Sequence, residues 1–228
     1  MPIKTTEWYY EAKQPTPSGF HHEEEYKIIS SHIKLTRGMK ILDAGCGRAR
    51  TDVELAEYGA EVTVLDTSKS AIEQAKINIE YYDVSMDALI GDITRIPVKS
   101  NTFDLVWNEG VIEHLRFPID GLLEMVRVTK SGQNVLVIVP NKFTIWRFVS
   151  VIRQIIGLAP KGRGITPFEL KKIFRKAGLT HIDTYGIHLF PWGIFKKLRL
   201  ENGYRLIEKS RCFLHTIFGL QTIGVGRK

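Results

Sequence analysis

Between residues 39 and 139 the chain alternates short apolar runs with longer amphipathic stretches. The apolar runs predict strands near 39–43, 61–66, 86–90, 103–107 and 134–139. The amphipathic stretches, apolar at every third or fourth position, predict helices near 50–58, 69–80 and 118–128. This order of elements builds a parallel sheet with helices on both faces. Side chains at the carboxyl ends of its strands should therefore lie close together.

Further elements are expected on both sides of this alternation. One helix should begin after Thr166, because Thr166 suits an N-cap, Pro167 the first helical position and Glu169 the third. Gly178 is expected to end that helix. The other flanking elements are a helix at about 23–34 and strands at 180–186 and 220–225.

The stretch 41–51 is the centre of the pattern, since an apolar strand runs through a glycine turn into a helix. Gly45 and Gly47 can adopt backbone angles closed to other residues and let a ligand approach the main chain. The N–H groups that open the helix add donors and a partial positive charge. The stretch therefore predicts a ligand-binding corner, although a plain strand-to-helix turn would carry the same glycines.

Two carboxylates indicate which ligand suits this corner. A dinucleotide-binding turn would have a third glycine where this chain has Arg50, and Asp43 would repel a pyrophosphate. Asp43 would instead attract an ammonium or a sulfonium. Asp66 follows Gly47 by 19 residues, a spacing that suits a carboxylate bridging two ribose hydroxyls. The corner therefore suits S-adenosylmethionine better than NAD.

A series of motifs along the chain resembles a known family. They are Asp-Ala-Gly-Cys-Gly at 43–47, Val-Leu-Asp-Thr-Ser at 64–68, Gly-Asp-Ile at 91–93, Phe-Asp-Leu-Val-Trp-Asn-Glu-Gly-Val-Ile-Glu-His-Leu at 103–115 and Val-Leu-Val-Ile-Val-Pro-Asn at 135–141. In this order they resemble class I S-adenosylmethionine-dependent methyltransferases, closely over about 35–141 and loosely over 164–228. The third glycine that the family usually has in its turn is Ala49 here.

The resemblance implies a fold and a set of cofactor-binding residues. The fold is α/β: a Rossmann-like, doubly wound, mostly parallel seven-stranded sheet with an antiparallel last strand and a helical cap insertion. Asp43 and the main chain from Ala44 through Gly45 to Gly47 would hold the methionyl part of the cofactor. The other implied cofactor contacts are Asp66 with Thr67 at the ribose, Asp92 with Ile93 at the adenine, and Asn108 beneath the methionine.

His114 is the candidate general base, because an imidazole with an ordinary pKa of about 6.5 can take a proton near neutrality. Capping of a helix is the alternative role.

Some related O-methyltransferases and RNA 3′-end methyltransferases carry Glu-x-x-Glu-His here and bind a divalent cation. Gly110 replaces the first glutamate and Glu109 stands one residue early. We expect no metal, and we find no acidic or cysteine partner at ligand spacing from the pair His21 and His22.

The length fits one domain, and the resemblance implies a single methyltransferase domain over residues 1–228, with an arm and helix at 1–34 and cap or acceptor-side elements at 142–164 and 187–218. The 228 residues can bury one sizeable core, and no apolar run reaches the roughly 20 residues that span a bilayer. Cys46 and Cys212 lack metal spacing, which favours a reducing, cytoplasmic setting. Cys46 stands at a helix N-terminus, where it is either a small filler or a thiolate.

Positive charge gathers in the second part of the chain. Residues 141–228 hold 17 Lys and Arg against 4 Asp and Glu, whereas the whole chain has a net charge of +7. Such asymmetry indicates an acidic substrate, a nucleic acid or an anionic membrane surface, or only solvated helix faces. Aromatic and basic residues interleave over 189–207, which fits a pocket cap, a peripheral membrane contact or stacking on single-stranded RNA.

These features predict an enzyme that uses S-adenosylmethionine to methylate a small-molecule acceptor of lipid-like or acidic character. Two alternatives stay open at this point. One is a methyltransferase-fold binding module without catalysis, and the other is an RNA methyltransferase that uses the basic part of the chain.

Overall fold

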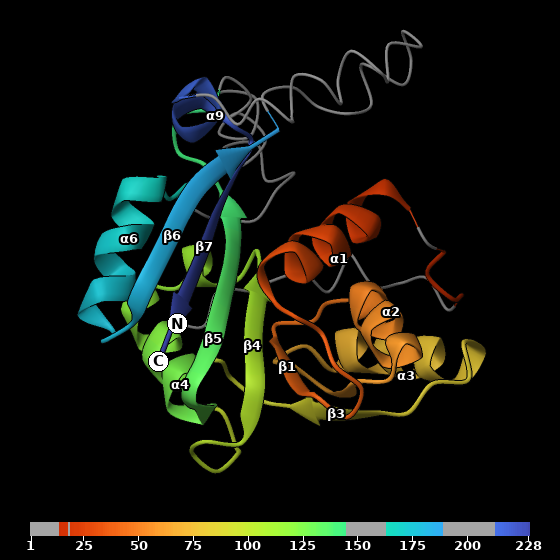
Figure 1. The fold of residues 1–228 in the computed structure, drawn as a ribbon. Helices are drawn as coiled ribbons and strands as arrows, with labels where there is room; N and C mark the ends of the chain where they lie inside the picture. The colour runs from red at the N-terminus through yellow and green to blue at the C-terminus, as the bar shows by residue number, and fades with distance from the viewer. Residues whose placement is uncertain (1–13, 18, 145–162, 189–212) are drawn as a thin grey trace, which may run out of the picture. The chain divides into compact units, whose positions relative to one another are not determined.

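The structure is a computed structural model that describes residues 14–17, 19–144, 163–188 and 213–228. Its elements are labelled in Figure 1. In chain order they are α1 (Phe20–His32), β1 (Lys40–Ala44), α2 (Arg50–Tyr58), β2 (Glu61–Asp66), α3 (Lys69–Tyr81), β3 (Met86–Ile90), β4 (Phe103–Glu109), the 3₁₀ helix η2 (Ile112–His114), α4 (Pro118–Val128), β5 (Thr129–Pro140), α6 (Pro167–Lys176), β6 (Thr180–Ile187), α9 (Phe213–Phe218) and β7 (Gln221–Arg227).

The strands form one seven-stranded sheet in the order β3-β2-β1-β4-β5-β7-β6. β1 pairs in parallel with both β2 and β4, and β2 pairs in parallel with β3. β7 runs the opposite way, because Asn141 bonds to Leu220 at one end of β5 while Lys228 bonds to Gln133 at the other. Figure 1 shows this reversed arrow between β5 and β6. The expected mixed α/β sheet with an antiparallel last strand is confirmed.

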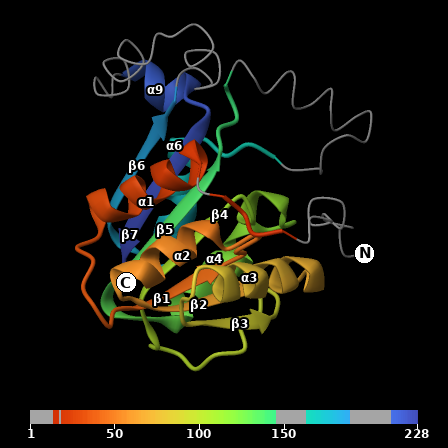
Figure 2. The same ribbon diagram turned by 90° about the vertical axis from the view of Figure 1, so that its right-hand side faces the viewer.

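Two compact units can be distinguished, and the first comprises residues 1–109, 120–136 and 227–228. Its strand β1 is apolar on both faces, and Ile41, Leu42 and Ala44 of β1 are fully buried. α2 and α3 pack against β2, and α1 lies beside α2 (Figures 1 and 2). This arrangement places the N-terminal helix next to the turn that follows β1.

The second unit comprises residues 110–119 and 137–226. α6 begins with the expected capping box, in which Thr166 and Glu169 exchange hydrogen bonds with each other's main chain. Leu170 and Phe174 of α6 lie directly over Gly224 of β7, where a Cβ atom would come within 2.7 Å of Leu170. A larger residue at 224 would therefore push α6 away from the strand.

Most predicted element bounds agree with the structure to within a few residues, and β5 differs most. It begins at Thr129 rather than near 134. Its polar first half gives no apolar signal, yet it is held by pairs such as Lys130 Nζ with Asp104 Oδ1 at 2.7 Å. The predicted cap elements at 142–164 and 187–218 lie largely outside the described residues. No helix in the described part of the chain is long and apolar enough to cross a membrane.

Candidate active site

The turn after β1 has an unusual backbone path that its sequence permits. Gly45 has φ 120° and Gly47 has φ 50°, while Ala49, the residue in place of the third glycine, also has a positive φ of 52°. The N–H groups of Gly45 and Cys46 both donate to the carbonyl of Leu65, at 2.7 and 3.1 Å. The turn is thereby fastened to the end of β2.

Asp66 ends β2 and completes this connection. Its carboxylate accepts hydrogen bonds from the N–H groups of Gly47 at 3.1 Å and Ser68 at 2.9 Å. Burial raises the pKa of Asp66, and the bonds from Ser68, Gly47 and Thr67 oppose that rise. A carboxylate can accept about four hydrogen bonds, so with these three in place it can accept about one more, from a ribose hydroxyl. Thr67 itself is exposed.

Asn108 lies on β4, the other neighbour of β1. Its side chain is fully buried, and Nδ2 donates to the carbonyl of Ala44 at 2.6 Å. Among the described residues no donor reaches Oδ1 of Asn108. A buried acceptor without a donor is costly, so this oxygen suits a ligand that brings an N–H group or a water molecule.

Two buried carboxyls lie beneath the turn. Asp43 at the end of β1 and Asp52 in the first turn of α2 are 3% and 1% exposed and face each other. In the described part of the chain, no hydrogen-bond partner reaches Oδ1 of Asp43 or either oxygen of Asp52. Burial raises the pKa of both carboxyls, that of Asp52 to about 7, and each carboxyl also acts on the other. Acceptors without donors fit a cationic ligand such as an ammonium or a sulfonium.

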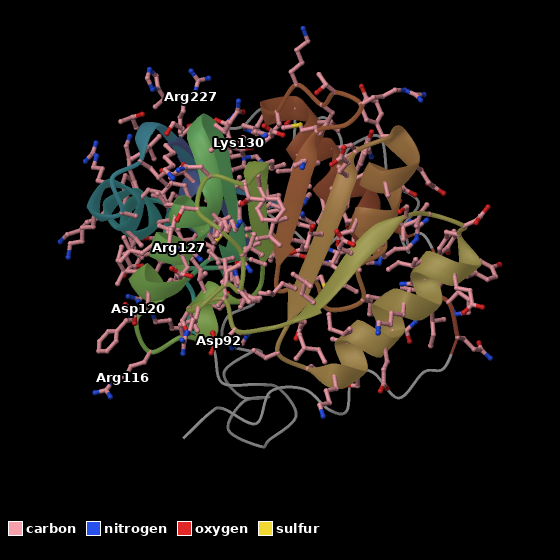
Figure 3. The ribbon with its side chains drawn as sticks, turned by 90° about the horizontal axis from the view of Figure 1, so that it is seen from below. Asp92, Arg116, Asp120, Arg127, Lys130 and Arg227 are labelled. Carbon is pink, nitrogen blue, oxygen red and sulfur yellow. The ribbon has the colours of Figure 1, made fainter. Side chains whose placement is uncertain are left out.

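The end of β3 is joined to the same corner, since the N–H of Gly91 donates to the carbonyl of Asp66 at 3.0 Å. Asp92 is exposed, and its carboxylate accepts two bonds of 2.8 Å from Thr94. Ile93 is buried. Arg127 on α4 (Figure 3) anchors the segment that follows, through bonds of 2.8 Å to the carbonyls of Ile96 and Val98.

Comparison with known proteins agrees with this geometry. Residues 42–137 match the methyltransferase domain family. The ubiquinone biosynthesis O-methyltransferase of Coxiella burnetii is 28% identical over 221 residues, which cover 92% of this chain and 91% of the relative. The enzyme of the same name from Nitrosococcus oceani is 29% identical over 179 residues, covering 72% and 73%.

Two solved structures show the same fold. An S-adenosylmethionine-dependent methyltransferase from Archaeoglobus fulgidus has a TM-score of 0.64 at 18% identity, covering 91% of this chain and 94% of its own. Phosphoethanolamine N-methyltransferase 2 of Haemonchus contortus, in complex with S-adenosyl-L-methionine, has a TM-score of 0.68 at 16% identity, covering 93% and 53%. Together these similarities support a class I S-adenosylmethionine-dependent methyltransferase.

In this methyltransferase all the predicted cofactor-binding residues lie in the first unit. Asp43, Ala44, Asp66 and Asn108 are brought together by the pairing of β1 with β2 and β4 and by the hydrogen bond from Asn108 to Ala44. His114 belongs to the second unit, where it is the last residue of η2. Its Nε2 lies 3.7 Å from Oε1 of the buried Glu113. The roles of these residues remain predictions.

The sequence analysis did not predict that His21, Glu25 and Glu109 lie together. His21 Nε2 is 3.1 Å from Glu25 Oε1 and 3.2 Å from Glu109 Oε1. Glu25 also accepts a hydrogen bond from Thr51 at the start of α2. The prediction from the sequence that His21 has no acidic partner at ligand spacing is therefore wrong. The i, i+4 spacing of His21 and Glu25 on a helix was the available signal.

Cys46 acts as a filler of the turn. The side chain is buried, and this burial, together with the negative charge of Asp43, raises the pKa of the thiol well above its usual value. A protonated, buried thiol is a poor nucleophile. The interpretation of Cys46 as a small residue in a tight turn is favoured over a reactive thiolate.

Proposed function

We propose that this methyltransferase transfers a methyl group to a hydroxyl oxygen of a small, lipid-like acceptor with acidic character. One observation carries the proposal: the match to a ubiquinone biosynthesis O-methyltransferase extends over 92% of this chain. It therefore includes most of the second unit as well as the cofactor corner. The basic balance of residues 141–228 supports an acceptor that carries negative charge.

S-adenosylmethionine, when bound, supplies an electrophilic methyl group on a positively charged sulfur. Asp43 and Asp52 would stabilise the positive charge of the cofactor, and Asp66 would hold the ribose. Asn108 would fix the main chain at Ala44 through its hydrogen bond. Holding the acceptor oxygen in line with the methyl carbon is the main task, and such positioning can lower the barrier by about 7–11 kcal/mol.

The proton of the acceptor hydroxyl needs a destination, and we propose His114. Its imidazole lies near the buried carboxylate of Glu113, which can hold the ring in one orientation and stabilise its protonated form. A hydroxyl of low acidity gains most from such a base, since it is a weak nucleophile while protonated.

The location of the enzyme follows from the same reasoning. A lipid-like acceptor resides in a membrane, and a basic surface is attracted to anionic headgroups by about 1 kcal/mol per Lys or Arg. We therefore propose a cytoplasmic enzyme that contacts the membrane peripherally through its basic C-terminal region. Co-sedimentation of the protein with anionic liposomes would support this proposal. Retention on heparin alone would instead indicate that the basic region binds a polyanion.

A panel of acceptors with methyl-labelled S-adenosylmethionine tests the function. The panel contains a polyprenyl-substituted dihydroxybenzene, the same ring without its tail, phosphoethanolamine and a short RNA. We expect label on the hydroxylated ring, with a lower KM when the tail is present. Label on the amine or the RNA alone contradicts the proposal. Calorimetric titration with S-adenosylmethionine and with NAD shows beforehand that the cofactor corner is intact.

A further inference from the structure

A second cluster of polar side chains lies beside the cofactor corner. His21 and Glu25 stand one helical turn apart on α1, and Glu109 ends β4. Their ligand atoms, one per residue, all lie within 4.8 Å of one another. All three residues belong to the first unit, so the fold itself joins α1 to β4 at this point.

The distances in this cluster are those of a metal-ligand set. A divalent cation with ligand bonds of about 2.1 Å and ligand angles of roughly 90–100° separates neighbouring ligand atoms by about 3.0–3.2 Å. His21 Nε2 lies 3.1 Å from Glu25 and 3.2 Å from Glu109. A protonated imidazole between two carboxylates has similar distances, so charge must decide between the two arrangements.

The charge around the cluster is in excess of what one imidazole can neutralise. Glu25 is 5% exposed and accepts a hydrogen bond from Thr51. The carboxyls of Glu109 and Asp52 both lie close enough to act on the carboxyl of Glu25. Asp52 is itself buried, and among the described residues neither of its oxygens has a hydrogen-bond partner. A dication would compensate this surplus, whereas one imidazolium leaves part of it.

We propose that His21, Glu25 and Glu109 bind a divalent cation through one imidazole nitrogen and two carboxylate oxygens. Mixed nitrogen and oxygen ligands favour Mn²⁺ or Zn²⁺ over Ca²⁺. The site differs from the incomplete motif at Gly110, Glu113 and His114, which lies in the second unit. The side chain of His21 is 62% exposed, so solvent and further ligands have access to the cation.

The cation would lie close to the chemistry of the enzyme, because Glu109 directly follows Asn108 on β4. A hydroxyl that coordinates a divalent cation loses its proton more readily. This role rests on the proposed function, but the binding of the cation does not.

Metal binding is tested on the full-length, chelator-treated protein by calorimetric titration with Mn²⁺ and Zn²⁺ in the absence of cofactor and acceptor. We expect one site per chain, confirmed for Mn²⁺ by paramagnetic resonance. Glu109→Gln and His21→Ala should each weaken binding at least about tenfold. Glu24→Gln is the matched control, since Glu24 lies on the same helix, paired with Lys27, and should change nothing.

Each variant is also titrated with S-adenosylmethionine, which shows that the first unit is folded. Wild-type protein that binds neither cation, or substituted proteins that bind both cations as tightly as wild type, would overturn the proposal. If His21→Ala does not fold, the isosteric Glu109→Gln decides alone. Because no acceptor is present, metal binding can succeed while the proposed acceptor fails, and the reverse is also possible.

Discussion

The N–H of Gly47 donates a hydrogen bond of 3.1 Å to Oδ2 of Asp66. This bond joins the turn after β1 to the end of β2, and the second oxygen of Asp66 accepts from Ser68. One carboxylate therefore shapes the turn and presents its remaining acceptor capacity to a ligand. Removal of this side chain should therefore weaken cofactor binding more than it destabilises the fold.

Asp66→Ala should weaken the affinity for S-adenosylmethionine by at least about tenfold while the protein stays folded. Hydrogen bonds to a charged group contribute about 1.5–3 kcal/mol each, and those to the ribose would be lost. Calorimetric titration measures the affinity, and circular dichroism reports the fold. Unchanged affinity in a folded variant would remove the assignment of Asp66 to the ribose.

The contribution of Asp52 to the free energy of unfolding of the cofactor-free protein should fall as pH rises from about 4 to 7. The pKa of Asp52 rises from 3.8 to about 7 because the carboxyl is buried. In this pH range the folded state therefore holds a proton that the unfolded chain has released, so raising the pH favours unfolding. Above pH 7 this contribution should level off.

Asp52→Asn should reduce that fall, because the amide does not titrate. Urea unfolding at pH 5 and pH 8 measures the difference between the two free energies. Glu57→Gln, an exposed position on the same helix, is the control and should behave like wild type. An equal fall in wild type and Asp52→Asn would show that Asp52 is not the responsible group.

Alanine substitutions at Gly45 and Gly47 should lower the free energy of unfolding by different amounts. Gly45 has φ 120°, which lies outside the left-handed region, whereas Gly47 at φ 50° matches Ala49 at φ 52°. Gly45→Ala should therefore cost roughly 2 kcal/mol or more of the free energy of unfolding, and Gly47→Ala about 1 kcal/mol. Urea denaturation of both variants measures the order. A larger loss for Gly47→Ala would mean that contacts, rather than backbone angles, limit the turn.

His114→Ala should lower turnover by about 10²–10⁴-fold and leave the affinity for S-adenosylmethionine nearly unchanged. Removing a general base affects the proton transfer, which cofactor binding does not involve. Steady-state kinetics on the methylated acceptor give the turnover, and calorimetric titration gives the affinity for S-adenosylmethionine. Wild-type turnover would leave His114 with only a structural role at the end of η2.

The juxtaposition of the strand ends at the corner could be predicted from the sequence because the information for it is local. Asp43, Asp66 and Asn108 each stand at or next to the carboxyl end of an apolar strand, and parallel pairing alone brings such ends together. The contact of His21 with Glu109 was not predictable in this way, since it depends on how α1 packs in three dimensions across 88 positions of sequence. The polar first half of β5 was missed because polar contacts such as that of Lys130 with Asp104, which leave no apolar pattern, help to hold it in the sheet.

The facing carboxyls of Asp43 and Asp52 also bear on what happens after methyl transfer. Under the proposed role of these carboxyls, conversion of the charged sulfonium into a neutral thioether would remove part of the positive charge that balances them. Their repulsion and their missing hydrogen-bond partners then return as a cost to the bound state. The demethylated cofactor should therefore dissociate more readily than S-adenosylmethionine does. The same two side chains would then favour replacement of the used cofactor by a new one between turnovers.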